Sequence, residues 1–77
     1  MNYSIKFSET AKENLSSIDR KIAELILHRL EKIREDPFRF VKRLKGIPLF
    51  SLRIEDYRVI MDIRSKQMLI FVIRVRH

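Results

Sequence analysis

The chain has 77 residues and no cysteine, and 45% of its residues are hydrophobic while 35% are charged, which is typical of one small globular domain without disulfides or thiolate metal sites. No apolar run approaches the roughly 20 residues of a membrane span, and the first residues lack the apolar segment of a signal peptide, so we expect a cytoplasmic protein without a membrane partner. The net charge of +7 lies entirely in residues 39–77, which carry ten Lys or Arg and three Asp or Glu. This asymmetry indicates nucleic acid, another polyanion or an acidic protein as partner, although a basic surface kept for solubility remains the alternative.

The N-terminal residues predict a strand followed by a helix. Tyr3, Ile5 and Phe7 alternate with polar residues, the period-2 pattern of a strand with one buried face. Ser8 and Thr10 are both candidate N-caps of the helix. Its apolar stripe, at positions i, i+4 and i+7, consists of Ala11, Leu15 and Ile18.

A second helix is predicted to begin after Asp19, which can cap it, and to end at Asp36, because Pro37 disfavours helical geometry in the residue before it. We expect the two helices to form a hairpin that lies on a sheet. The residues expected on the apolar face of the second helix are Ile22, Leu25, Ile26, Leu30 and Ile33.

A basic connection, residues 38–48, follows the second helix. Gly46 is the only glycine of the chain and marks a backbone position with a positive φ angle. Apolar side chains are expected to anchor the connection to the core, namely Phe38, Phe40, Val41 and Leu44. The basic side chains are expected outside, and they are Arg39, Lys42, Arg43 and Lys45.

Three β-rich runs complete the chain, at residues 49–54, 57–63 and 68–75. The predicted fold class is α+β, with an N-terminal strand, a two-helix hairpin and a three-stranded antiparallel meander that completes a twisted sheet, all within one domain of residues 1–77. Glu55 and Asp56 form the expected two-residue turn, which places Arg53 opposite Arg58. Because like charges directly opposite one another are destabilising, we interpret this pair as an anion site, with a solvated face as the alternative.

The sheet face away from the helices is expected to be uncovered. In the simplest register it carries Ser51, Arg53, Arg58, Ile60, Leu69, Phe71, Ile73 and Val75, but a slip of one residue in the preceding turn would exchange the faces of the last strand. Apolar surface rimmed by arginine is typical of a partner site. The partner-binding residues predicted here are Ser51, Ile60, Leu69, Phe71 and Ile73.

The residue types exclude several chemistries. The two histidines belong to no ligand cluster, so we expect neither a metal nor another cofactor, and one glycine cannot build a phosphate loop. RNA cleavage stays open, because it needs a base and cations for the phosphate; Arg53 and Arg58 are the candidate cations and His77 is the candidate base. The expected RNA-positioning residues are Arg39, Lys42, Arg43, Lys45, Arg74 and Arg76.

Five motifs together resemble the RelE/ParE toxin superfamily. They are Phe7-Ser8-x-x-Ala11, Asp36-Pro37, Leu44-Lys45-Gly46-x-Pro48, Leu52-Arg53-Ile54-x-Asp56-Tyr57-Arg58-Val59-Ile60 and Phe71-x-Ile73-x-Val75-x-His77. The resemblance implies a toxin that pairs with an acidic, RelB-like antitoxin. It implies either cleavage of mRNA at the ribosomal A site, as in RelE-like members, or inhibition of DNA gyrase, as in ParE-like members.

The resemblance also implies roles for individual residues. It implies Arg53 as a cation of the strand, with Ser51 where family members often have lysine, and Arg58 as the arginine of the hairpin. Family members continue past the position of His77 with a basic residue and a tyrosine, which this chain lacks. Three explanations stay open: the sequence is truncated, His77 and Arg76 replace the missing groups, or the chain is an inactive remnant that binds an antitoxin or RNA.

Overall fold

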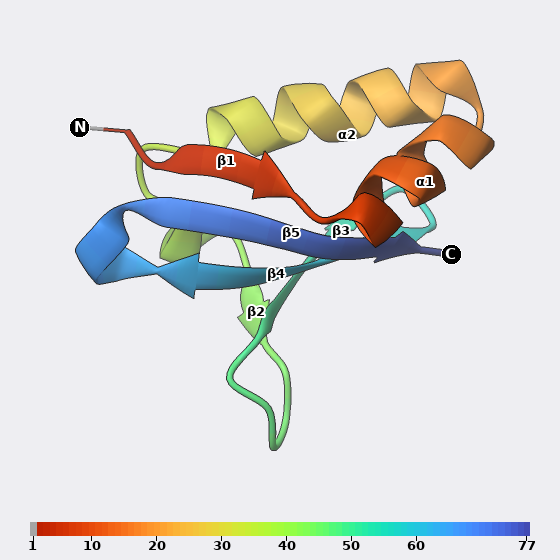
Figure 1. Cartoon of the computed structure of the whole chain (residues 1–77). Helices are drawn as coiled ribbons and strands as arrows, with labels where there is room; N and C mark the ends of the chain where they lie inside the picture. Colours follow the sequence, from red (N-terminus) through yellow and green to blue (C-terminus); the bar gives the residue numbers. More distant parts are fainter. Residues whose placement is uncertain (1) are drawn as a thin grey trace.

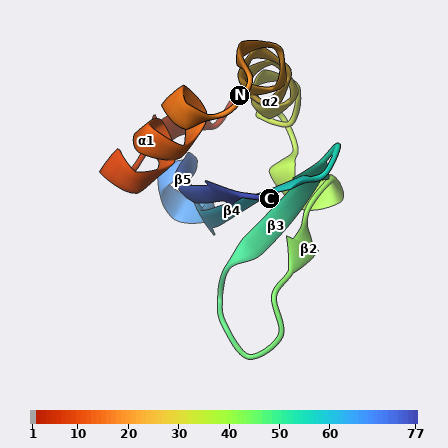
Figure 2. The same ribbon diagram turned by 90° about the vertical axis from the view of Figure 1, so that its right-hand side faces the viewer.

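The computed structural model describes residues 2–77 and contains a five-stranded sheet with two helices on one face (Figures 1 and 2). The strand order is β1-β5-β4-β3-β2, with β1 parallel to β5 and every other pair antiparallel. This arrangement confirms the predicted α+β fold. The elements are β1 (Ser4–Phe7), α1 (Glu9–Ser17), α2 (Arg20–Lys32), β2 (Lys42–Arg43), β3 (Phe50–Ile54), β4 (Tyr57–Arg64) and β5 (Leu69–Arg76), with 3-10 turns at Pro37–Arg39 and Ser65–Gln67.

Two side chains begin the helices. Of the two candidates for α1, Ser8 is the N-cap, and its Oγ accepts a hydrogen bond of 3.0 Å from the N–H of Ala11. Asp19 caps α2 as predicted, by accepting from the N–H of Lys21 at 2.8 Å. Helix α2 ends at Lys32, four residues before the expected end, and the chain then turns toward Pro37. Within residues 2–77, neither helix is long and apolar enough to cross a bilayer.

The core lies between the helices and one face of the sheet. Ile26 and Leu30 of α2 are fully buried there and pack against Met61 of β4 and Val72 of β5, among others. The predicted apolar face of α2 is therefore confirmed, and Tyr57 belongs to the same face of the sheet as a half-buried residue. Burial of this face fixes which side of each strand faces away from the helices.

A β-bulge exchanges the faces of β5 part-way along the strand. Ile60 pairs with Arg74 and the next residue, Met61, pairs with Val72, so Ile73 has no partner on β4. Before the bulge the inward residues of β5 are Ile70 and Val72, and after it the inward residue is Val75. The expectation that Val75 lies on the uncovered face is therefore wrong.

Helix α1 covers the edge of β5 where β1 has ended. Strand β1 pairs with β5 only as far as Val72. Beyond that point the hydroxyl of Ser8 donates to the carbonyl of Ile73, and the side-chain oxygen of Asn14 accepts from the N–H of Val75. The N-cap side chain of α1 and one side chain within the helix thus satisfy backbone groups that a longer strand would otherwise pair.

Candidate nucleic-acid interface

Three arginines form a row across three strands on the face away from the helices. Arg53 of β3 is the register partner of Arg58 of β4, and Arg58 is in turn the partner of Arg76 of β5. The predicted opposition of Arg53 and Arg58 is confirmed, and the bulge adds Arg76 by turning it to the same face. Register partners lie about 5 Å apart, so three guanidinium groups converge on one small area.

The turn between β3 and β4 holds the first arginine in place. Glu55 has a φ of 55°, in the left-handed region, and its carbonyl accepts a hydrogen bond of 3.2 Å from Arg53 Nε. This bond leaves the terminal nitrogens of Arg53 available to another acceptor. All three arginines are exposed, and none of them has an ion-pair partner among residues 2–77.

His77 lies beside the arginine row. A hollow of about 230 Å³ is lined by Arg53, Asp56, Arg58, Arg76 and His77. The imidazole packs edge-on against the ring of Tyr57, with 5.0 Å between ring centroids and 71° between ring planes. All three residues expected to carry catalysis therefore line one hollow, but the imidazole itself lies against Tyr57, which belongs to the helix-covered face of the sheet. The hollow also includes Asp56, which the sequence indicated only as a turn residue.

A larger basic cleft of about 640 Å³ reaches from the arginine row to the connection after α2. Seven of its lining residues are basic and none is acidic. The basic members are Arg29, Arg39, Lys42, Arg43, Lys45, Arg53 and Arg58. The expected positioning residues of the connection thus share one cleft with the candidate catalytic arginines. Arg29 comes from α2 and was not predicted.

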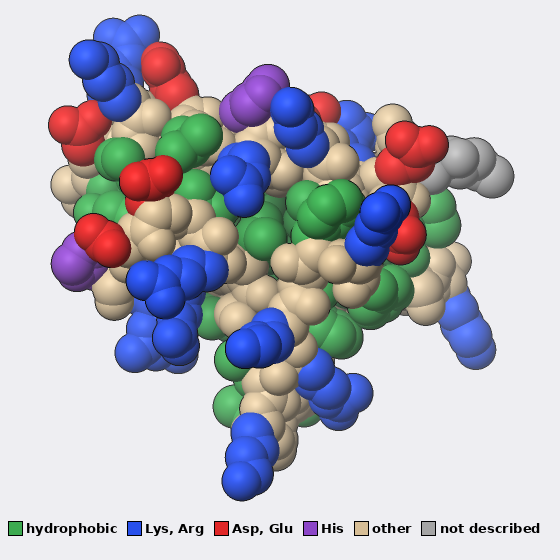
Figure 3. All heavy atoms as spheres, turned by 180° about the vertical axis from the view of Figure 1, so that it is seen from behind, with side chains coloured by type: hydrophobic (Ala, Val, Ile, Leu, Met, Phe, Trp, Pro, Cys, Tyr) green, Lys and Arg blue, Asp and Glu red, His purple; other side chains and the backbone are tan. Residues whose placement is uncertain are grey.

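The β2–β3 hairpin, with its connecting residues 44–49, extends this basic surface away from the body (Figures 1 and 3). Figure 3 shows Lys and Arg side chains along the hairpin, whereas the acidic side chains visible in that view lie above it. Gly46 has a φ of 77°, as the sequence predicted. A β-carbon there would meet nothing within 4 Å, so the backbone conformation and not the space favours glycine.

The two phenylalanines of the connection do not anchor it as expected. Phe38 is 45% exposed and its ring meets Phe50 edge-on, at 5.4 Å between centroids. Phe40 is 52% exposed and lines the basic cleft. Val41, and not Phe38 or Phe40, packs against the core in this segment.

The predicted partner face is less open than expected. Leu69 and Phe71 lie on it and are half-buried, as is Ser51. Ile60 is only 4% exposed, so its predicted role as an accessible apolar contact is wrong in this chain. Ile60 lies on β4, which has a strand on each side. Long side chains on those strands can cover the apolar surface of a residue between them. Ile73 is half-buried at the bulge.

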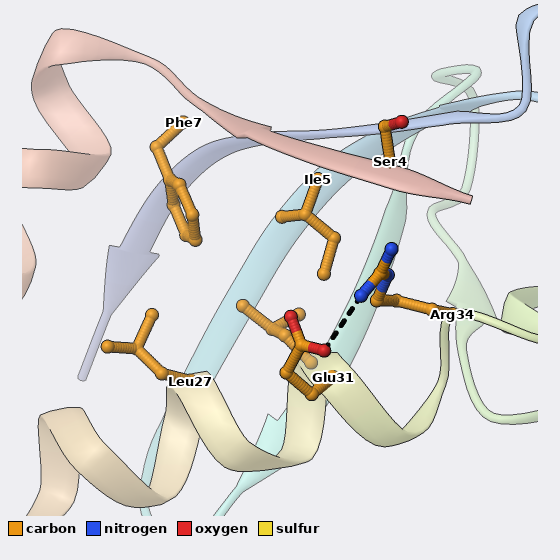
Figure 4. A pocket seen from close by; sticks show the side chains of 7 residues that line it. Ser4, Ile5, Phe7, Leu27, Glu31 and Arg34 are labelled. Atoms are coloured by element: carbon orange, nitrogen blue, oxygen red, sulfur yellow. Dashed lines mark hydrogen bonds and ion pairs between the residues drawn. The ribbon is translucent and has the colours of Figure 1, made fainter. Parts of the chain in front are cut away.

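The opposite edge of the sheet has a different hollow, of about 460 Å³, between β1 and α2 (Figure 4). Ile5, Phe7 and Leu27 point into it. At one end Arg34 forms an ion pair of 2.8 Å with Glu31, and its Nε donates to the carbonyl of Tyr3 at 2.7 Å. These contacts attach the N-terminal strand to α2, and the hollow lacks the basic character of the cleft.

Among residues 2–77, no three His, Asp or Glu side chains converge in a way that could hold a metal ion. The groups that line the hollow at the arginine row are guanidinium groups, one histidine and one carboxylate. Guanidinium groups bind phosphate oxygens in pairs of parallel hydrogen bonds. The row and the cleft together fit the charge of a nucleic-acid backbone.

Known proteins resemble this chain both in sequence pattern and in fold. Residues 5–77 match the family model described as ParE toxin of the type II toxin–antitoxin system parDE. A search of curated proteins finds no match. The fold is similar to that of a chain in the RelBE2 toxin–antitoxin complex of Mycobacterium tuberculosis, with a TM-score of 0.92 at 24% identity, covering 100% of this chain and 99% of that chain.

Two further solved structures have the same fold. One is the archaeal RelE–RelB complex of Pyrococcus horikoshii, with a TM-score of 0.83 at 24% identity over 99% of this chain and 94% of that chain. The other is the intact RelBE toxin–antitoxin complex of Escherichia coli, with a TM-score of 0.82 at 22% identity over 96% of this chain and 94% of that chain.

Proposed function

Because this chain belongs to the ParE toxin family of type II toxin–antitoxin systems, within the RelE/ParE superfamily, we propose that it is a toxin that cleaves mRNA at the ribosomal A site. The observation that carries this proposal is the row of Arg53, Arg58 and Arg76 with His77 beside it. A gyrase inhibitor needs no phosphate-binding group of this kind for its own chemistry. Phosphodiester cleavage needs cations at the phosphate and a base near the nucleophile, and these are the residue types that line the hollow at the arginine row.

The proposed reaction uses the 2′-hydroxyl of the RNA as nucleophile. His77 takes the proton of that hydroxyl, the O2′–P bond forms, and the P–O5′ bond breaks, which leaves a cyclic phosphate. The departing O5′ takes a proton from water, and the hydroxide so formed takes the proton back from His77. Arg53 and Arg58 stabilise the additional negative charge on the phosphate oxygens as the five-coordinate state forms. Arg74, Arg76 and the cations of the basic cleft hold the flanking phosphates.

We further propose an acidic, RelB-like antitoxin as the protein partner. The relatives from M. tuberculosis, P. horikoshii and E. coli were solved as toxin–antitoxin complexes. The net charge of +7 on this chain, with the excess on the cleft side, favours a partner of opposite charge. Such a partner would compete with mRNA for the same cations in the cytoplasm.

Cleavage of mRNA on programmed ribosomes tests the proposal. We expect the chain to cut mRNA in the A site and Arg58→Ala to lose about 100-fold or more of the rate, as when one transition-state donor is removed. Arg20→Ala is the matched control, since the side chain of Arg20 is 91% exposed on α2 and pairs with Glu24. Cleavage that survives Arg53→Ala and Arg58→Ala together would contradict the assignment.

A second candidate is inhibition of DNA gyrase. It is favoured by the family model, whose description is that of a ParE toxin. Inhibition of gyrase supercoiling, with no mRNA cut on ribosomes, would select this candidate. Binding of an antitoxin without either activity would select the inactive remnant.

A further inference from the structure

Phe40 is an exposed aromatic ring in the basic cleft. It is 52% exposed and shares the cleft lining with Arg53 and Arg58. Its ring lies outside the hydrophobic core, as single apolar side chains on protein surfaces often do. Its neighbour Val41 provides the core contact of this segment.

One face of this ring is already occupied by a cation. The guanidinium carbon of Arg39 lies over the Phe40 ring, 5.8 Å from its centroid. This contact restricts the orientation of the ring.

A basic groove that contains an exposed aromatic ring is the arrangement that binds single-stranded nucleic acid, because cations follow the backbone while a ring stacks on a base. Phe38 does not fit this role, since its ring already packs edge-on against Phe50. Ile47 is 48% exposed on the same hairpin segment but does not line the cleft. The cleft therefore has one available aromatic platform within residues 2–77.

We propose that Phe40 is a base-stacking platform for single-stranded RNA, which holds a nucleotide next to the one whose phosphate meets Arg53 and Arg58. The proposal rests on RNA as the substrate of the proposed function. Stacking is tolerant of base identity, so Phe40 contributes affinity and position without choosing a sequence. The cleft lining has no acidic group, which favours RNA over a basic or neutral ligand there, whereas the neighbouring hollow that Phe40 and Arg39 also line contains Glu35 and Asp36.

The chain contains no tryptophan, so Phe40→Trp introduces a single fluorophore at the platform. The probe is a single-stranded RNA of about 12 nucleotides, within the site sizes of such grooves. We expect the RNA to quench the tryptophan, whereas an abasic RNA of the same length binds through its phosphates without quenching. Ile47→Trp is the matched control and is expected to stay unquenched.

Binding affinity provides the second readout. Phe40→Ala should weaken binding of the normal RNA by about 5- to 150-fold, the range expected for one stacked base. It should leave the affinity for abasic RNA unchanged, and Ile47→Ala should change neither. Circular dichroism of each variant checks that the fold is intact.

The RNA-binding experiments test the Phe40 platform, and the ribosome experiment tests mRNA cleavage, so either proposal can fail without the other. Quenching at position 40 without mRNA cleavage on ribosomes supports the platform and removes the nuclease. RNA binding without quenching, or an equal loss of affinity for normal and abasic RNA in Phe40→Ala, overturns the platform whatever the cleavage result.

Discussion

The side-chain oxygen of Asn14 in α1 accepts a hydrogen bond of 3.0 Å from the backbone N–H of Val75 in β5. Strand β1 has ended by this point, so the helix supplies the acceptor that a neighbouring strand would have supplied. Val75 is the residue by which β5 resumes contact with the core after the bulge. The contact between α1 and β5 therefore holds the strand segment that carries Arg74 and Arg76.

We expect Asn14→Leu to destabilise the protein by about 1–3 kcal/mol, because the N–H of Val75 loses its partner in a half-buried place. Asn14→Asp keeps an acceptor oxygen and should lose much less. Urea denaturation of the two variants measures the difference in the free energy of unfolding. Equal stability of Asn14→Leu and the original chain would show that the hydrogen bond contributes nothing.

The turn residue Glu55 has a φ of 55°, in the left-handed region that glutamate tolerates less well than asparagine or glycine. We expect Glu55→Asn to raise the free energy of unfolding by about 0.5–1 kcal/mol. Arg53 should keep its contact, since it binds the backbone carbonyl of Glu55 and not the side chain. Asp56→Asn is the control in the same turn, and a gain there of similar size would point to charge as the cause.

Arg58→Lys keeps the positive charge of the arginine row but loses the planar fork. We expect mRNA cleavage to fall by about 10- to 100-fold, since one ammonium replaces two charge-assisted hydrogen bonds. Arg64→Lys, at the far end of β4 with an ion pair of 2.9 Å to Asp62, is the matched control and should cleave normally. Full activity of Arg58→Lys would mean that charge alone acts at this position.

If RNA binds in the basic cleft, its binding constant should fall as the salt concentration rises. Each phosphate contact contributes about 0.7 to the slope of log K against log salt for a single strand. Lys42→Ala and Lys45→Ala should each lower the slope by about that amount. Lys66→Ala, in the turn before β5, should leave the slope unchanged. Fluorescence anisotropy at several salt concentrations measures the slope, and an unchanged slope in both cleft variants would place the RNA elsewhere.

The opposition of Arg53 and Arg58 was predictable because a two-residue turn leaves only one register. The bulge in β5 was missed, although the sequence holds a sign of it. Ile70 and Val72 are two residues apart, as one face of a strand requires, but the next inward residue, Val75, follows after three and lies between two arginines. A change in the spacing of apolar residues from two to three indicates a bulge in a strand of this kind.

Other features left no signal in the sequence. Asn14 reads as an exposed polar residue of a short helix, since nothing local shows that its partner lies on β5. Strand β2 has two residues, too few for an alternating pattern. The exposure of Phe40 depends on Val41 taking the core position beside it, and neighbouring apolar residues in a loop do not reveal which of them is buried.

The pairing of β1 with β5 joins the two ends of the chain in one sheet. During synthesis, residues 4–7 leave the ribosome well before residues 69–72 exist, and until then Ile5 and Phe7 have no neighbouring strand to pair with. Arg76, the third arginine of the row, is also made late. We therefore expect a nascent chain stalled before residue 69 to be protease-sensitive and harmless.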